Sequence, residues 1–335
     1  MLVAFPGGSK DEREGYANTS HERKNKAMTE PATTSNNQIE IRPLSVHIGA
    51  EITGVNIAKP LPGPTVAAIR ETLLRWKVVF FRDQDLDHES HVRFARCFGR
   101  PTPGHVVFGG DAVYPEIYSI AKHRTANEGK NPVRRSWTDW HTDITAAVNP
   151  PAASILRGEI VPPYGGDTFW TNLAIAYDRL SETLRGFLDE LRAIHCFNAP
   201  SDMNAAEDYE KQTGENDLVA EHPLITVHPE TGERVLYVSP DFVKSIVGLA
   251  PRESQALLEM LWEHAVQAEF TVRFKWEPGS VAFWDNRATA HLAPNDIFAT
   301  DFDRQFYRVT LAGEASIGVD GRPSIALSGK PIPNL

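Results

Sequence analysis

The sequence predicts a mainly β fold with flanking helices, in the form of a β-barrel or jelly roll. Three observations favour this class over a doubly wound α/β sheet. Strand-like segments are spread over the whole chain, helical patterns are inserted between them at irregular intervals, and no internal repeat is present. Strands distributed in this way, with helices packed outside them, are typical of barrels and jelly rolls.

The folded part of the chain is expected to begin near residue 38. Residues 1–37 carry mixed charges and polar side chains, which cannot bury enough apolar surface to offset the entropy of ordering, so we expect a disordered leader. Its apolar start, residues 1–5, is too short for the h-region of a secretory signal. Residues 38–335 are expected to form a single domain.

The first elements follow from local patterns. Strand-like alternation covers residues 39–41 and 50–55, where glycine breaks it. Pro64 then opens a helical pattern, since proline is favoured in the first turn of a helix. The apolar run at 78–81 predicts a buried strand directly after this helix. The apolar face of the helix is formed by Val66, Ile69, Leu73 and Trp76.

Three further helices are predicted from their starting signals. Asp87 is a candidate N-cap for the second helix, and Ser181 can cap a third one that runs to about Leu191. Pro251 starts a fourth, which runs to about residue 266. The remaining strand patterns cover residues 152–156, 224–227, 235–238, 270–276, 281–284 and 304–311.

Composition and charge exclude several classes of protein. The chain carries 34 Lys and Arg against 44 Asp and Glu, a formal net charge of −10, which argues against a general nucleic-acid binder. No apolar run approaches the ~18 residues that a membrane helix requires. We therefore expect a cytoplasmic protein with neither a nucleic-acid nor a membrane partner.

The cysteines and two polar stretches carry weaker expectations. Cys97 and Cys196 cannot form a disulfide scaffold, the sequence has no C-x-x-C motif, and we expect both to be buried small hydrophobic residues. The polar stretches 122–137 and 198–221 are expected to be either solvated surface loops or active-site lids.

Two tripeptides have a spacing that suits a metal site. His141 and Asp143 are two residues apart, as are His228 and Glu230, and side chains at i and i+2 of an extended segment point to the same face. One imidazole and one carboxylate can then reach the same cation. A third ligand from a later strand, for which His291 is the candidate, would complete the two-histidine, one-carboxylate set of non-heme Fe(II) oxygenases.

The second tripeptide has a structural explanation. Residues 228–232 read His-Pro-Glu-Thr-Gly, which is typical of a reverse turn, and they separate the strand patterns at 224–227 and 235–238. We therefore interpret His228 and Glu230 as part of a hairpin turn and retain His141 and Asp143 as the candidate ligands.

Two arginines near the C-terminus support an anion-binding interior. Residues 304–311 form a strand pattern in which Arg304 and Arg308 share one face, while Tyr307, Val309 and Leu311 share the other. Guanidinium groups inside a barrel are costly without anions, and each offers a fork that matches a carboxylate or a sulfate. If that face is solvated instead, the pair is only a surface charge ladder.

Taken together, these segments resemble the taurine dioxygenase (TauD/TfdA) family. The family consists of Fe(II)- and 2-oxoglutarate-dependent dioxygenases on a double-stranded β-helix, a cupin-like jelly roll. The resemblance extends over about residues 39–331. The matching segments are Trp-His-Thr-Asp at 140–143, Gly-Gly-Asp-Thr at 165–168, Trp-Asp-Asn-Arg at 284–287, His291, Arg304 and Arg308.

The resemblance implies roles for individual residues. His141, Asp143 and His291 match the iron ligands of the family. Thr168 and Arg304 match the residues that hold the distal carboxylate of 2-oxoglutarate, and Arg308 matches an arginine shared between this cosubstrate and the anionic substrate. Three further positions match or lie near substrate-binding residues of the family: His105, whose spacing is one residue longer than in the taurine enzymes, Ile144, which corresponds to an apolar contact, and Trp137.

The substrate class follows from the same comparison. Trp137 stands where taurine enzymes carry an asparagine for the substrate amine, so the chain is more similar to the alkyl sulfate ester dioxygenases. These hydroxylate the carbon next to a sulfate ester or sulfonate with O2 and 2-oxoglutarate, and release sulfate or sulfite, an aldehyde, succinate and CO2. We expect a small anionic organic substrate and a homo-oligomer, either a dimer or a tetramer.

Two alternatives stay open at this point. The same chemistry could act on a carboxylate, such as a phenoxyalkanoate or another small organic acid, because Arg308 and His105 could bind either anion. A cupin-like metallohydrolase could use the same two histidines and one aspartate. The arginine pair argues against a hydrolase, since a water-activating site does not require a dicarboxylate anchor.

Overall fold

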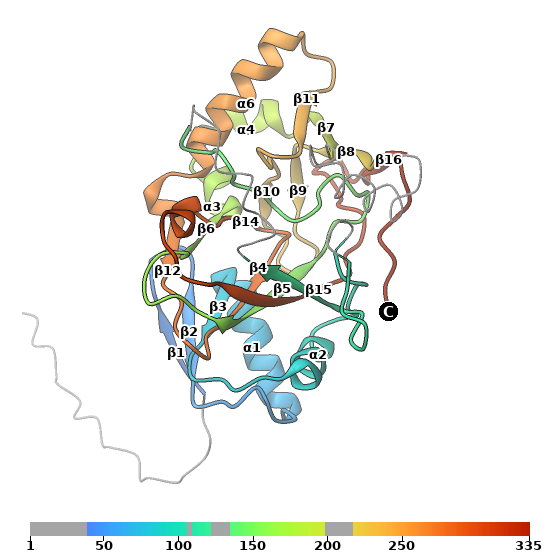
Figure 1. Cartoon of the computed structure of the whole chain (residues 1–335). Helices are drawn as coiled ribbons and strands as arrows, with labels where there is room; N and C mark the ends of the chain where they lie inside the picture. The colour runs from blue at the N-terminus through green and yellow to red at the C-terminus, as the bar shows by residue number, and fades with distance from the viewer. Residues whose placement is uncertain (1–38, 106–108, 122–134, 198–216) are drawn as a thin grey trace, which may run out of the picture. The chain divides into compact units, whose positions relative to one another are not determined.

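The structure is a computed structural model and describes residues 39–105, 109–121, 135–197 and 217–335 (Figure 1). The predicted leader lies outside the described residues, as do most of the two polar stretches. The elements are β1 (Glu40–Pro43), β2 (Ala50–Thr53), α1 (Gly63–Trp76), β3 (Val78–Phe81), α2 (His88–Arg96), β4 (Ile117–Ala121), β5 (Ala153–Ile160), β6 (Thr168–Asn172), α3 (Leu173–Asp178), α4 (Glu182–Leu188), β7 (Arg192–Cys196), β8 (Val219–Pro223), β9 (Ile225–Val227), β10 (Arg234–Leu236), β11 (Val243–Ile246), α6 (Pro251–Ala265), β12 (Thr271–Phe274), β13 (Val281–Asp285), β14 (Thr289–Leu292), β15 (Gln305–Leu311) and β16 (Ile325–Ser328).

The main sheet has seven strands in the order β1-β2-β3-β13-β5-β15-β4. Its pairings are antiparallel except for that between β2 and β3, which is parallel. Because side chains alternate along a strand, each central strand sends residues to both faces. On β3, Val79 and Phe81 face one side and Val78 and Phe80 the other, and all four are buried.

Helices α1 and α2 cover one face of this sheet, where they lie next to each other (Figure 1). Ile69 and Leu73 of α1 and Phe94 of α2 pack in one cluster with Val79 and Phe81 of β3. Asp87 caps α2 as predicted: its carboxylate accepts the backbone N–H of Ser90 at 2.8 Å. This layer forms the outer side of the barrel wall.

The three-stranded sheet β12-β6-β14 closes the other face. Phe80 of the main sheet stacks on Phe274 of β12 with 4.0 Å between ring centroids, and Trp170 of β6 lies 5.6 Å from Trp284 of β13. These aromatic side chains fill the space between the two sheets. The mainly β, jelly-roll fold predicted from the sequence is therefore confirmed.

The remaining strands and helices form a second packed region. Strands β7 and β11 of the sheet β11-β7-β8-β16 share an apolar cluster with the hairpin β9–β10 and with α3, α4 and α6, and α3 packs against α6. The hairpin confirms the turn predicted at residues 228–232: Gly232, at φ 72°, donates its N–H to the carbonyl of His228 at 2.9 Å. Among the described helices, none is long and apolar enough to cross a bilayer.

Two expectations differ from the structure. Cys97 was expected to be buried but is exposed, because it follows α2 at its C-terminal end, while Cys196 is partly buried at the end of β7. The helix capped by Ser181 ends at Leu188 rather than near Leu191, because β7 begins at Arg192 and pairs with both β8 and β11.

Candidate active site

Three predicted ligand residues come together at one end of the barrel. His141, Asp143 and His291 each offer one ligand atom, and these three atoms lie within 4.8 Å of one another. Among the described residues, this is the only group of three or more potential metal ligands that lie this close together. The backbone holds them there: His141 donates its N–H to the carbonyl of His291 at 2.9 Å, and His291 donates back at 2.7 Å. A short antiparallel bridge therefore ties the loop that carries two ligands to β14, which carries the third.

The backbone on either side of the His-x-Asp pair is unusual. Asp139 has φ 67° and Ile144 has φ 43°, a region that a β-branched residue rarely adopts. A residue held there costs on the order of 1–3 kcal/mol, which the surrounding structure must offset. The conformation turns the chain sharply directly after Asp143, so His141 and Asp143 are both presented to His291.

The histidine nitrogens are oriented for ligation. Nδ1 of His141 is 3.0 Å from the carbonyl oxygen of Asp139, which makes Nδ1 the protonated nitrogen and leaves the lone pair on Nε2. Nε2 of His291 lies 3.7 Å from Oδ1 of Asp143. Burial, together with the nearby His141, holds the pKa of His291 well below its usual value, so this imidazole is neutral, the form that binds metals.

The second oxygen of Asp143 faces a buried polar network. Oδ2 accepts a hydrogen bond from the Ser154 hydroxyl at 2.8 Å and forms an ion pair with Arg308. Arg308 also donates to Ser154 at 2.8 Å, and its guanidinium lies over the Trp284 ring, 4.6 Å from the centroid. Arg308 is buried and points into the barrel from β15, as predicted, and burial lowers the pKa of its guanidinium.

Arg304 lies just before β15, which begins at Gln305. Its guanidinium covers the Phe306 ring at 4.1 Å, and Gly166, at φ 66°, leaves room for it, since a Cβ there would lie 3.1 Å from Arg304 Nε. Burial lowers the pKa of Arg304 to about 10, and its Nε has no hydrogen-bond partner among the described residues. A desolvated guanidinium of this kind favours a bound anion.

Thr168, the other residue matched to 2-oxoglutarate binding, is buried at the start of β6. Its hydroxyl oxygen accepts the indole N–H of Trp276 at 3.0 Å. Trp276 in turn packs against Phe306 with 4.7 Å between ring centroids. Thr168 and Arg304 therefore contact the same aromatic pair.

The three residues matched to the substrate lie in different surroundings. The ring centroid of His105 lies 5.2 Å from that of Tyr118, and Tyr118 of β4 is paired with Arg308 of β15. Burial, with smaller contributions from the nearby Arg308 and His141, lowers the pKa of His105 to about 3. Ile144 packs in a small apolar cluster with Ala146, Ala147, Leu218 and Phe242. Trp137 is buried in the cluster of α6, 6.0 Å from Trp262, so its contact with a substrate stays a prediction.

The sequence did not single out Ser154 or the role of Asn286. Asn286 Nδ2 donates to the Ser154 hydroxyl at 2.9 Å, and the Trp284 indole donates to Asn286 Oδ1 at 2.8 Å. The one available signal was a lone hydroxyl residue inside the otherwise apolar strand pattern at 152–156. A buried polar side chain of this kind needs partners, which only the strand pairing identifies.

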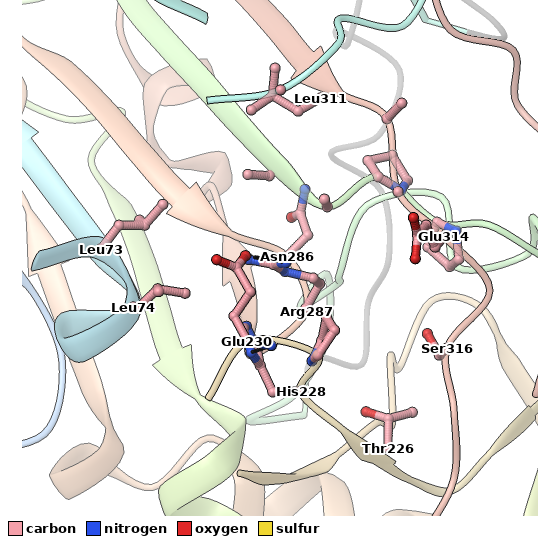
Figure 2. A pocket seen from close by; sticks show the side chains of 18 of the residues that line it. Leu73, Leu74, Thr226, His228, Glu230, Asn286, Arg287, Leu311, Glu314 and Ser316 are labelled. Atoms are coloured by element: carbon pink, nitrogen blue, oxygen red, sulfur yellow. Dashed lines mark hydrogen bonds and ion pairs between the residues drawn. The ribbon is translucent and has the colours of Figure 1, made fainter. Parts of the chain in front are cut away.

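A cavity of about 570 Å³ is lined in part by Asn286 and Arg287, but by none of the three ligand residues (Figure 2). Figure 2 shows His228, Glu230, Asn286 and Arg287 gathered at one side of it. Glu230 pairs with Arg70 and Arg287, both at 2.7 Å, and His228 Nε2 lies 3.0 Å from Asp285. The His228-x-Glu230 pair is therefore part of an ion-pair network that holds the hairpin turn.

The chain is similar to several known proteins. The model of the family "Taurine catabolism dioxygenase TauD, TfdA family" matches residues 40–310. An alpha-ketoglutarate-dependent sulfate ester dioxygenase of Pseudomonas putida is 39% identical over 86% of this chain and 94% of its own, and an alkylsulfatase of Acinetobacter baylyi is 37% identical over 85% and 88%.

Solved structures lead to the same family. The crystal structure of a taurine dioxygenase from Burkholderia xenovorans is 60% identical, with a TM-score of 0.78, over 88% of this chain and 96% of that one. A structure of AAD-2 in complex with Mn(II) and N-oxalylglycine is 25% identical, with a TM-score of 0.68, over 83% and 99%. The chain belongs to the TauD, TfdA family of α-ketoglutarate-dependent dioxygenases, oxidoreductases that require 2-oxoglutarate and a metal ion.

Proposed function

We propose that this chain is an Fe(II)- and 2-oxoglutarate-dependent dioxygenase that hydroxylates the carbon next to a sulfate ester, or to a sulfonate. The single observation that carries the proposal is the cluster of His141, Asp143 and His291 directly beside the buried Arg308. A metallohydrolase would need only the two histidines and the aspartate, and the buried guanidinium beside them supports an anion-binding site next to the metal. The sulfate ester dioxygenase and the alkylsulfatase among the relatives support this substrate class.

The residues fit the groups that the family requires. Two imidazoles and one carboxylate would hold Fe(II) and leave positions for 2-oxoglutarate and O2. Arg304 and Thr168 would hold the distal carboxylate of 2-oxoglutarate, since Arg304 Nε has no partner among the described residues. The bound iron supplies the activation of O2 that C–H hydroxylation requires.

The chain's own residues would position the substrate. Arg308 and His105 would face the anionic head, Arg308 as a charged donor and His105 as a neutral imidazole, since burial lowers the pKa of His105 to about 3. Ile144 and its apolar cluster lie next to Asp143 and would contact the alkyl chain and exclude water. The substrate is thus expected to be a small anion with an apolar tail.

The reaction balances without a further reductant. One oxygen atom of O2 enters succinate as 2-oxoglutarate loses CO2, and the other replaces the substrate C–H bond with C–OH. When the same carbon carries a sulfate ester, the product is hemiacetal-like: its C–O bond to sulfate breaks, the hydroxyl proton is lost, and an aldehyde and sulfate are released. A sulfonate would release sulfite in the same way.

A carboxylate substrate is the second candidate. A (S)-phenoxypropionate/alpha-ketoglutarate-dioxygenase of Sphingobium herbicidovorans is 30% identical over 76% of this chain and 88% of its own length. Arg308 could bind a carboxylate as well as a sulfate. The comparisons favour the dioxygenase over a metallohydrolase. The expectation of a cytoplasmic homo-oligomer stays a prediction.

The test is a matched panel assay of succinate release with alkyl sulfates of increasing length, taurine and phenoxyacids. Each buried CH2 is worth about 0.8 kcal/mol, so kcat/KM should rise about fourfold per CH2 until the apolar pocket is full, and alkyl sulfates should exceed taurine. Asp143→Ala should abolish turnover while the protein stays folded. A larger kcat/KM for taurine or a phenoxyacid, or no trend with chain length, would contradict the sulfate ester assignment.

A further inference from the structure

We propose that Ser154 is a positioning residue for the metal-binding carboxylate and that Asn286 orients it. The inference rests on the proposed function, because it takes Asp143 as a metal ligand. Ser154 lies in β5 opposite Trp284 of β13, and its side chain is completely buried. Its hydroxyl oxygen is 2.8 Å from Asp143 Oδ2, 2.9 Å from Asn286 Nδ2 and 2.8 Å from a terminal nitrogen of Arg308.

The donors and acceptors allow one arrangement of protons. The Trp284 indole only donates and lies 2.8 Å from Oδ1 of Asn286, so the amide nitrogen of Asn286 faces Ser154. This nitrogen and the Arg308 guanidinium are also donors only. Both lone pairs of the Ser154 oxygen are therefore occupied, and its proton is left for Oδ2 of Asp143.

This arrangement assigns different tasks to the two carboxylate oxygens. Oδ2 of Asp143 is held by Ser154 and Arg308, whereas Oδ1 faces Nε2 of His291 at 3.7 Å. The carboxylate thus presents Oδ1 to the ligand cluster, and rotation about its Cβ–Cγ bond would break the Ser154 bond. Partners of this kind orient metal ligands, and their loss commonly costs 10–100-fold in metal affinity or activity.

The position of Ser154 argues against a role in packing alone. Ala153, Ile155 and Leu156 beside it in β5 are buried and apolar, and a hydroxyl in such a place is costly unless it is hydrogen-bonded. One partner of the Ser154 hydroxyl is Asp143 itself. The other two act on the same contact, because Arg308 pairs with Asp143 and Asn286 orients the hydroxyl toward it. An alanine would fill almost the same volume without these bonds.

The test measures metal affinity in the absence of turnover. Mn(II) is titrated into anaerobic protein with 2-oxoglutarate present, and free Mn(II) is followed by its electron paramagnetic resonance signal. Ser154→Ala is expected to bind Mn(II) at least tenfold more weakly than the wild type. Ser280→Ala is the matched control, because Ser280 is also completely buried and accepts two hydrogen bonds, from Arg82 and from the backbone of Glu277, but lies away from Asp143. Its Mn(II) affinity should be unchanged.

Two further variants separate the hydroxyl from its volume. Ser154→Thr keeps the hydroxyl and adds a methyl group to a filled site, so a hydroxyl role predicts tighter Mn(II) binding than in Ser154→Ala, whereas a packing role predicts the reverse order. Asn286→Ala leaves Ser154 in place and removes its orienting donor. It should weaken binding several-fold and provides the measurement if Ser154→Ala does not fold.

The outcomes distinguish this inference from the proposed function. Wild-type Mn(II) affinity in Ser154→Ala, or weaker binding by Ser154→Thr than by Ser154→Ala, would overturn the positioning role. If Ser154→Ala does not fold, unchanged affinity in Asn286→Ala would overturn it as well. A wild-type protein that binds no Mn(II) would instead overturn the metal site, and with it the proposed function.

Discussion

Arg304 and Arg308 are four residues apart on one side of the barrel, but their surroundings differ. Arg308 contacts Asp143 and Ser154, so its charge is balanced inside the site. Arg304 lies over Phe306, and its Nε has no partner among the described residues. Because a desolvated guanidinium is costly without an anion, these surroundings support the proposal that Arg304 binds the distal carboxylate of 2-oxoglutarate.

Arg304→Ala should therefore raise the KM for 2-oxoglutarate strongly. Loss of a buried bidentate carboxylate contact costs on the order of 2–5 kcal/mol, or at least about thirtyfold in affinity. Arg304→Lys is the control, since it keeps the charge but loses the fork, and should lie between the wild type and Arg304→Ala. Steady-state kinetics with each substrate varied in turn provide the measurement. An increase confined to the KM of the organic substrate would show that the roles of Arg304 and Arg308 are exchanged.

Elements with strong local signals were predictable from the sequence. Asp87 and Ser181 cap helices where expected, and the glycine-containing turn at 228–232 forms the predicted hairpin. Helix α3 was missed because it has only six residues, and its one local signal is the cap Asn172, which accepts the N–H of Ala174 at 3.0 Å. Short helices of this kind are stabilised by tertiary packing.

Site residues were predictable only where chemistry identified them. His141, Asp143 and His291 have ligand side chains, so the sequence offered them as candidates and the structure brings them together. Ser154 and Asn286 have no such signature. Their meaning depends on the pairing of β5 with β13, which sets Ser154 opposite Trp284 and brings the chain after β13 against β5. Such long-range pairing is not visible in a single strand.

The turn that follows β13 is held by charges, which gives a prediction for this element. Burial would raise the pKa of Asp285, but Arg287 and His228 outweigh it and hold the pKa well below its usual value. Arg287→Met should lower the free energy of unfolding by about 3 kcal/mol, at the lower end for a broken buried pair, because His228 remains beside Asp285. Urea unfolding measures this change.

The matched variant for this prediction is Arg70→Met. Arg70 pairs with Oε2 of Glu230, whereas Arg287 pairs with Oε1. Because the Arg70 side chain is 45% exposed, its loss should lower the free energy of unfolding by less than about 1 kcal/mol. Mn(II) affinity should be unchanged in both variants, in contrast to Ser154→Ala. Equal destabilisation by the two substitutions would show that burial of Asp285 does not decide the effect.

At the scale of the whole molecule, buried histidines link stability to pH. Burial lowers the pKa of His91 in α2 to about 3, with a contribution from Arg157, and burial lowers the pKa of His222 in β8 to about 4. His195 of β7 lies beside His222, with 4.8 Å between ring centroids, and burial also holds the pKa of His195 well below its usual value. His91 lies in α2, whereas His195 and His222 lie in the sheet β11-β7-β8-β16, so more than one part of the fold contributes to the dependence of stability on pH.

The direction of the effect follows from proton binding. An unfolded chain takes up protons on His91 and His222 as the pH falls through the ordinary histidine pKa of 6.5, whereas the folded chain does not until about pH 4 or below. Between about pH 6.5 and pH 4 the unfolded state therefore binds more protons than the folded state, and the free energy of unfolding decreases as the pH is lowered. Each such histidine contributes a slope of about 1.4 kcal/mol per pH unit once it is fully protonated in the unfolded chain.

His91→Gln should therefore weaken the dependence of stability on pH. The His91 ring is completely buried, and its Nε2 lies 3.2 Å from the carbonyl oxygen of Ile155, so a glutamine can keep that hydrogen bond but cannot titrate. Urea unfolding of metal-free protein from pH 7.5 to 5 would compare the variant with the wild type, after subtraction of the constant difference at pH 7.5. The two curves then coincide at pH 7.5 and should separate as the pH falls, with the wild type about 1–2 kcal/mol below the variant at pH 5, because the wild type loses one additional proton-linked contribution. Curves that coincide down to pH 5 would show that His91 takes up its proton equally in both states, and its burial would then carry no acid sensitivity.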